Sequence, residues 1–198
     1  QHIYIYSPSG AVRDKAAFRR GVKRLQTLGH QVEVDEAALA SHQRFAGDDA
    51  TRLAAIRRAT ASGADVALIS RGGYGLTRIL PGLDFKALAK AIDRGTRFVG
   101  MSDFTALQMA VLAQTGRTTW AGPALCEGFG VSDKADAADG HGTVACGPDD
   151  IMQACFDDMV TGVSEGTGWR MPAAPGFAIK KEASNLNITK AIGSFSLK

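Results

Sequence analysis

Short apolar segments alternate with longer segments of helical periodicity along the first 125 residues of the chain. The apolar segments are rich in β-branched and aromatic residues, as is typical of strands. They are His2–Tyr6, His30–Val34, Ala64–Ser70, Arg97–Gly100 and Thr118–Pro123. Between them, apolar side chains three and four residues apart predict helices over Asp14–Leu28, Ala50–Ala61, Phe85–Arg94 and Phe104–Gln114.

This alternation predicts an α/β fold with a parallel sheet and helices on both faces. The segment Ala64–Ser70 supports it, because a strand covered on both faces shows a continuous apolar run rather than an alternation. Gly29 and the pair Ser62-Gly63 are placed to end the first two helices.

The pattern weakens after Pro123. Residues Val131–Pro148 are small, polar and glycine-rich, which favours a surface loop, and Asp149–Val160 predicts a helix capped by Asp149 or Asp150. Gly176–Lys198 has no strong period and fits either strands of a second domain or an irregular tail.

Composition narrows the class of protein. The chain has 198 residues, 45% of them hydrophobic and 22% charged, and carries a net charge of +3. Basic residues such as Arg19, Arg20, Lys23 and Arg24 are mixed with carboxylates and not with aromatic residues, so we interpret them as solvated helix faces and expect no nucleic-acid partner. No apolar run is long enough to span a bilayer, so no membrane partner is expected either.

The three cysteines, Cys126, Cys146 and Cys155, are odd in number and lack metal-ligand spacing. We interpret them as reduced thiols, which together with the absence of a signal-peptide pattern indicates a cytoplasmic location.

The strongest candidate for chemistry is Gly100-Met101-Ser102-Asp103, between a buried strand and a helix. A serine in such a turn, with glycine two residues before it, fits a nucleophile elbow, although Phe104-Thr105 replace the glycine that usually follows. Taken alone, the tetrapeptide fits equally well a serine that only caps the next helix.

Two other turns follow predicted strands, and the carboxyl ends of parallel strands meet at one edge of a sheet. Arg71-Gly72-Gly73-Tyr74-Gly75 could present backbone N–H groups to a carbonyl oxygen, and Arg71 could pair with a substrate carboxylate. Ser7-Pro8-Ser9-Gly10 could line the same crevice or simply turn the chain. None of the four histidines is placed by its sequence context as a base for Ser102.

Together these segments resemble the LD-carboxypeptidase (muramoyltetrapeptide carboxypeptidase) family of serine peptidases. The resemblance covers roughly residues 3 to 125. The matching segments, in order, are Ser7–Gly10, Phe45–Asp49, Arg71–Gly75, Gly100–Leu107 and Gly122-Pro123.

The resemblance implies hydrolysis of the L,D-peptide bond that releases terminal D-alanine from murein tetrapeptides, in cytosolic cell-wall recycling. It implies Ser102 as the catalytic nucleophile, with no metal and no cofactor. The oxyanion hole would be formed by Asp103, Gly72 and Gly73. The residues expected to contact the murein peptide are Arg71, Tyr74, Ser9 and Trp120.

The resemblance ends before the chain does. In the family, the histidine and glutamate of the triad come from a C-terminal domain that begins with a Gly-Gly-Asn-Leu-like turn. In this chain, Ser184–Asn187 resembles that turn only weakly. We therefore expect residues 1–165 to form the nucleophile-bearing domain and 166–198 to be a linker and a remnant of a largely absent C-terminal domain, or an irregular tail. An apolar patch left at a lost interface would favour self-association, with a homodimer as one expected state.

Two alternatives follow from the missing triad partners and from the family itself. The first is a binding module that recognises a D-amino-acid peptide without cleaving it, because a serine without a base is a weak nucleophile. The second is a peptidase of the branch that cleaves microcin-type peptide–nucleotide conjugates, for which Trp120 and Tyr74 are the aromatic candidates near the predicted site.

Overall fold

The computed structural model describes residues 1–132 and 147–162. The described part holds a parallel sheet in the order β2-β1-β3-β4-β5, with helices between the strands. The strands are β1 (His2–Tyr6), β2 (Gln31–Val34), β3 (Val66–Ile69), β4 (Arg97–Gly100) and β5 (Trp120–Ala121). The predicted α/β fold is confirmed, and only β5 is much shorter than its predicted strand.

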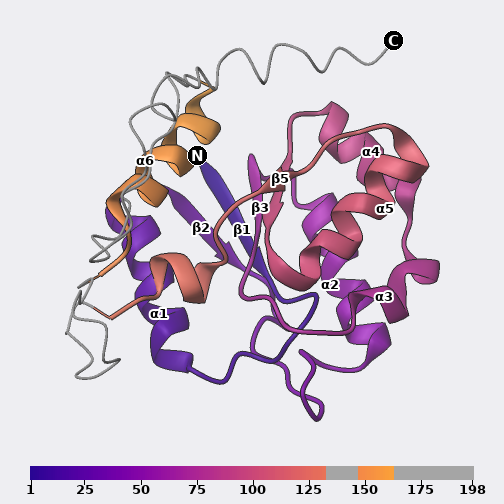
Figure 1. Ribbon diagram of the computed structural model, residues 1–198, viewed down its shortest axis with the longest axis horizontal. Coiled ribbons are helices and arrows are strands. Elements are labelled where there is room, and N and C mark those ends of the chain that lie inside the picture. The colour runs from indigo at the N-terminus through magenta and orange to yellow at the C-terminus, as the bar shows by residue number, and fades with distance from the viewer. Residues whose placement is uncertain (133–146, 163–198) are drawn as a thin grey trace, which may run out of the picture. The chain divides into compact units, whose positions relative to one another are not determined.

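Helices flank the sheet on both sides (Figure 1). They are α1 (Lys15–Thr27), α2 (Asp49–Ala61), α3 (Leu76–Ile79), α4 (Phe85–Asp93), α5 (Thr105–Thr115) and α6 (Asp150–Thr161). Short turns of tighter or wider helix are η1 (Leu80–Gly82), η2 (Ser102–Phe104) and η3 (Leu125–Phe129).

Side chains along each strand point alternately to the two faces of the sheet, so the core has two layers. On β1, Tyr4 and Tyr6 point to the layer covered by α2 to α5, whereas Ile3 and Ile5 point to the layer covered by α1, η3 and α6. β3 is buried at every position, as a strand packed on both faces must be. The sheet is thus held rigidly, and the turns at the carboxyl ends of its strands rest on a fixed support.

Helix boundaries follow local capping chemistry. Asp14 accepts hydrogen bonds from the first free amides of α1, Asp48 from Thr51 in α2, and Asp149 from Met152 in α6. Gly29 has φ +88°, a left-handed conformation that glycine adopts without steric cost, just beyond the end of α1.

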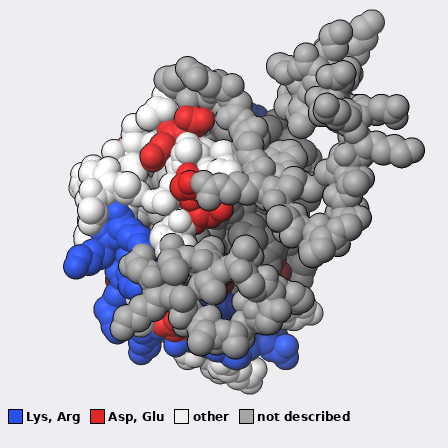
Figure 2. Space-filling model, turned by 60° about the vertical axis from the view of Figure 1, so that its left-hand side comes forward, with Lys and Arg blue, Asp and Glu red and all other residues white. Residues whose placement is uncertain are grey.

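The basic residues of α1 were interpreted above as solvated, and for two of them that is only partly right. Arg20 Nε donates to Gly130 O at 3.0 Å, and Arg24 Nη1 donates to Phe129 O at 2.6 Å and also to Val131 O. These arginines satisfy backbone carbonyls at the end of η3 and so fasten it to α1. On the face shown in Figure 2, Lys and Arg side chains gather in the lower part, and Asp and Glu side chains lie mainly above them.

None of the described helices has the length and apolar character that crossing a bilayer requires. The predicted loop 131–148 lies mostly, and the segment 166–198 wholly, outside the described residues.

Candidate active site

Three turns that are far apart in the sequence pack together at the carboxyl edge of the sheet. Gly10 N donates to Gly72 O at 3.2 Å, and Ala46 N donates to Ser9 O at 3.0 Å. Ser7 Oγ and Ser70 Oγ lie 2.6 Å apart, which joins the ends of β1 and β3. The predicted convergence of the Ser7–Gly10 and Arg71–Gly75 turns is confirmed, and the Phe45 segment joins them.

Ser102 occupies the turn after β4 with φ +62°. This left-handed backbone conformation is uncommon for a residue with a Cβ and typically persists at functional sites. Ser102 is exposed and is the first residue of η2, whose N-cap position is Met101, while the N-cap position of α5 is Phe104. The reading of Ser102 as a helix cap therefore has no support in the structure, whereas a strained strand-to-helix turn with an exposed hydroxyl is the geometry of a nucleophile elbow.

Glycines on both sides of Ser102 make room for this turn. A Cβ at Gly72 would stand 2.8 Å from Ser102 Cβ and 3.0 Å from its Oγ, and a Cβ at Gly100 would stand 2.6 Å from Phe104 Cδ1. Real Cβ atoms essentially never stand closer than 3.0 Å to such atoms, so a Cβ added at either position would force its neighbours to shift. The Gly72 backbone thus lies directly against the Ser102 side chain.

The side chain of Asp103 is already engaged, whereas its backbone amide is not. Asp103 Oδ2 accepts a hydrogen bond from Leu76 N at 3.0 Å and so caps α3. Within the described residues, the amides of Asp103, Gly72 and Gly73 donate no hydrogen bond. Backbone N–H groups beside a nucleophile can stabilise a negatively charged oxygen.

The four residues expected to contact the murein peptide occupy different environments. Tyr74, in the Arg71–Gly75 turn, is 63% exposed. The guanidinium carbon of Arg44 lies 5.7 Å from the centre of the Tyr74 ring. Arg71 donates to Ala11 O at 3.1 Å and lies 3.5 Å from Glu127 Oε1, so its guanidinium ties neighbouring segments together.

Ser9 and Trp120 are the other two. Ser9 is fully buried, and its hydroxyl has no hydrogen-bond partner among the described residues. Trp120 is 44% exposed on β5, where it pairs in register with Val99 and faces a cavity of about 550 Å³ between β5 and α6. Of these four residues, only Tyr74 is both largely exposed and part of the Arg71–Gly75 turn, which we call the glycine loop.

Among the described residues, no histidine forms a hydrogen bond with Ser102. His2 pairs with Glu33 at 2.9 Å at the start of β1, and His30 packs edge-on against Phe156. Burial lowers the pKa of His30. His42 lies in the segment before α2, and His141 lies outside the described residues. Within the described ranges, no group of three or more His, Cys, Asp or Glu side chains is arranged to hold a metal ion.

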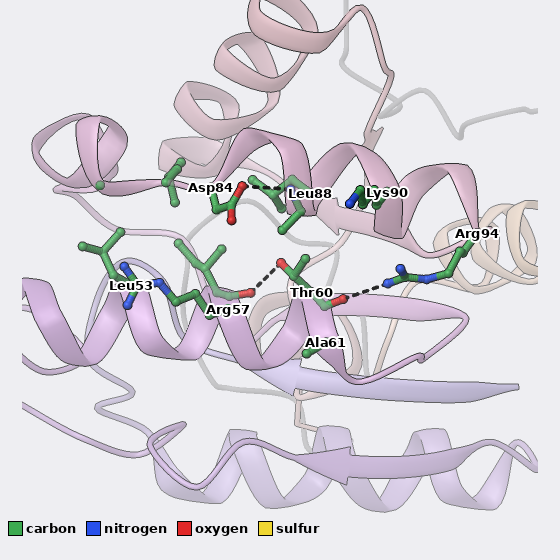
Figure 3. Close-up of a pocket in the computed structure, with 12 residues that line it drawn as sticks. Leu53, Arg57, Thr60, Ala61, Asp84, Leu88, Lys90 and Arg94 are labelled. Carbon is green, nitrogen blue, oxygen red and sulfur yellow. Dashed lines mark hydrogen bonds between the residues drawn. The ribbon is translucent and has the colours of Figure 1, made fainter.

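A second cavity of about 230 Å³ lies between α2 and α4 (Figure 3). Arg57 and Arg94 lie at its rim with Lys90, and Arg94 reaches across to the carbonyl of Thr60 at 3.4 Å. None of its lining residues belongs to the turns around Ser102, so it is separate from the candidate active site.

Arg52, whose sequence context indicates no functional role, contacts these turns in the structure. Its side chain is fully buried and donates to backbone carbonyls of two of them. An arginine in an otherwise ordinary helix gives no local signal of such a place.

Comparison with known proteins shows the family and the fold of the chain. Residues 3–122 match the family model of the LD-carboxypeptidase N-terminal domain. A probable murein peptide carboxypeptidase of Bacillus subtilis is 34% identical over 110 residues, which is 55% of this chain and 34% of that protein. A putative carboxypeptidase of Streptomyces coelicolor is 34% identical over 125 residues, or 61% of this chain and 39% of that protein.

Solved structures show the same fold. The muramoyltetrapeptide carboxypeptidase of Oxalobacter formigenes is 30% identical with a TM-score of 0.63, over 80% of this chain and 47% of that one. A MccF-like protein of Bacillus anthracis is 27% identical with a TM-score of 0.61, over 67% of this chain and 40% of that one. The chain thus spans between a third and a half of the length of these relatives.

Proposed function

Because the chain belongs to the LD-carboxypeptidase family through its N-terminal domain, we propose that it carries the nucleophile and oxyanion hole of a serine carboxypeptidase, with Ser102 as the nucleophile. The observation that carries this proposal is the left-handed backbone of Ser102, at φ +62°, at the exposed first residue of η2, just after β4. Strain of this kind is kept where it holds a reacting group in place.

In the proposed reaction, Ser102 Oγ attacks the carbonyl carbon of the scissile peptide bond while a base takes up its proton. The negative charge that develops on the carbonyl oxygen is stabilised by the free amides of Asp103 and of the Gly72-Gly73 turn. The leaving amine receives a proton, and water then hydrolyses the acyl-enzyme to regenerate Ser102. The reaction needs no metal and no cofactor.

We propose a murein tetrapeptide as the substrate and terminal D-alanine as the product, in cytosolic cell-wall recycling. The names of the Bacillus subtilis and Oxalobacter formigenes relatives support this substrate class. Tyr74 and Arg71 are proposed to contact the peptide, since both belong to the loop that touches Ser102. Ser9 is not proposed to contact the peptide, because it is buried.

One observation favours a second candidate, recognition without cleavage. No histidine of the described residues forms a hydrogen bond with Ser102, and a serine without a base remains protonated. The family resemblance assigns the base and its orienting glutamate to a C-terminal domain, so the nucleophile and its base are proposed to come from different parts of the intact protein.

The test is D-alanine release from a murein tetrapeptide by the intact protein, which is proposed to supply the base, and by its Ser102→Ala and Thr105→Ala variants. The Thr105 variant is a matched control, because it removes another exposed hydroxyl three residues further along. Release by the wild type and the Thr105 variant but not by Ser102→Ala is the expected result. Equal release by Ser102→Ala would refute the assignment of the nucleophile. Tetrapeptide binding without release by the wild type would indicate the second candidate.

A further inference from the structure

Arg52, in the first turns of α2, has a side chain that is fully buried. Removing a guanidinium from water is costly unless hydrogen bonds and opposite charges replace the water. Here the replacement is incomplete, because Arg52 Nε has no partner among the described residues. Since stability alone would not favour such a residue, its contacts suggest another reason for its place.

The guanidinium joins segments that are widely separated in the sequence. Nη1 donates to Gly75 O at 3.0 Å and more weakly to Pro8 O at 3.4 Å. Nη2 donates to Asp49 Oδ1 at 2.6 Å, and the guanidinium carbon lies 4.8 Å from the centre of the Phe45 ring. Three of the segments that carry the family resemblance therefore meet at one buried cation.

The contact with Gly75 is close enough to fix the conformation of the glycine loop. Gly75 has φ +110°, and a Cβ there would stand 2.6 Å from Phe45 Cε1 and 3.2 Å from Arg52 Nη1. The next residue, Leu76, donates to the side chain of Asp103, the neighbour of Ser102. At its other end the loop places Gly72 against Ser102 itself.

We propose that Arg52 is a positioning residue that holds the Pro8 and Gly75 turns in register, so that the Gly72 backbone and the Asp103 amide stand beside Ser102. This inference rests on the proposed role of Ser102 as a nucleophile. Arg52 forms no hydrogen bond with Ser102 and acts through the loop. A guanidinium suits this task better than an ammonium group, because its fork of N–H donors reaches several acceptors in fixed directions.

Arg58 provides a matched comparison on the same helix. It donates to Asp35 at 2.7 Å and 2.9 Å and lies 3.1 Å from Glu36, but it contacts none of the turns around Ser102. A variant of Arg58 therefore weakens an ion pair of α2 and leaves the loops in place, whereas a variant of Arg52 releases them.

The experiment is amide hydrogen exchange, measured by NMR, on the wild type, Arg52→Lys, Arg52→Met and Arg58→Lys. The reporter amides are Gly10, Ala46 and Leu76, because their acceptors are Gly72 O, Ser9 O and Asp103 Oδ2. The amide of Ser70, bonded to Tyr6 O at the end of β3, is the reference for global opening.

We expect both Arg52 variants to raise exchange at the three reporters by about tenfold or more relative to Ser70, as for a local opening. Arg58→Lys should change the exchange rates of the three reporter amides and of the Ser70 reference by the same factor. Reporters that stay unchanged relative to Ser70 in the Arg52 variants, or that open equally in Arg58→Lys, would overturn the proposal.

Two further measurements complete the test. If Arg52→Met fails to fold, Phe45→Leu keeps the arginine and removes only the ring; faster exchange at the same amides would support the proposal, and unchanged exchange would overturn it. D-alanine release by Arg52→Lys should show a lower kcat with little change in KM. Hydrogen exchange needs no turnover, so it still tests Arg52 if the proposed peptidase activity fails.

Discussion

Replacing Ser102 by glycine should make the protein more stable while it removes the proposed nucleophile. An L-residue in the left-handed region carries a steric cost of about 1–2 kcal/mol, which glycine does not. Glycine loses more chain entropy on folding, roughly 0.5–1 kcal/mol. With φ at +62°, the balance favours Ser102→Gly by about 0.5–1 kcal/mol.

This gain can be measured by thermal or urea unfolding. For a chain of this size it corresponds to a rise in Tm of about 1–4 °C. Ser102→Ala is the necessary reference, because it removes the same hydroxyl and keeps the Cβ that causes the strain. Its Tm should stay close to that of the wild type, and both variants should lose D-alanine release.

Gln43 offers a matched control outside the candidate site. It is the other described non-glycine residue in the left-handed region, with φ +56°, and it is exposed. Gln43→Gly should raise Tm relative to Gln43→Ala by a similar amount and leave D-alanine release unchanged. If Ser102→Gly is no more stable than Ser102→Ala while the Gln43 pair behaves as expected, the elbow is not strained and the argument from backbone conformation is wrong.

Three further outcomes are expected. Gly72→Ala should abolish D-alanine release and cost about 1–3 kcal/mol of stability, measured by urea unfolding, because the new Cβ would displace the Ser102 side chain. Burial would raise the pKa of Asp35, but hydrogen bonds from Arg58 and Tyr4 hold it below its usual value. Its stabilising effect is therefore present above the unfolded-state pKa and lost as pH falls through the folded one. Asp35→Asn should accordingly flatten the pH dependence of Tm on the acid side, whereas an unchanged profile would assign the acid sensitivity elsewhere. Burial raises the pKa of the Cys126 thiol to about 12, so native Cys126 should react with iodoacetamide at pH 8 far more slowly than in urea, as followed by mass spectrometry with Cys126→Ser as the control.

Features of the fold that depend on neighbouring residues could be predicted from the sequence. Asp14 caps α1 through amides two and three residues away. Gly100, two positions before Ser102, indicates a tight turn after a buried strand. Both signals are local, so they can be identified without knowledge of the fold.

Features that depend on distant residues could not be predicted. The short helix α3 was missed, because its first amide is capped by Asp103, 27 residues further along, and not by a residue of its own. Arg52 looks like a surface residue of an amphipathic helix, since nothing near it in the sequence shows that carbonyls 44 and 23 residues away will surround it. The predicted parallel sheet indicates that these turns lie at one edge. Only the packing in the structure shows that the Arg52 side chain joins them.

The backbone-to-backbone packing of the glycine turns has a consequence for how this site can change. A Cβ at Gly73 would stand 2.8 Å from the Gly10 backbone, just as one at Gly72 would meet Ser102. No single substitution at these glycines can be accommodated unless its neighbour moves as well, so stepwise mutation is blocked there. Tyr74 and Met101, by contrast, are exposed beside them and carry no such restriction. Natural divergence and laboratory libraries that seek a new peptide preference should therefore vary these two side chains and leave the glycine scaffold intact.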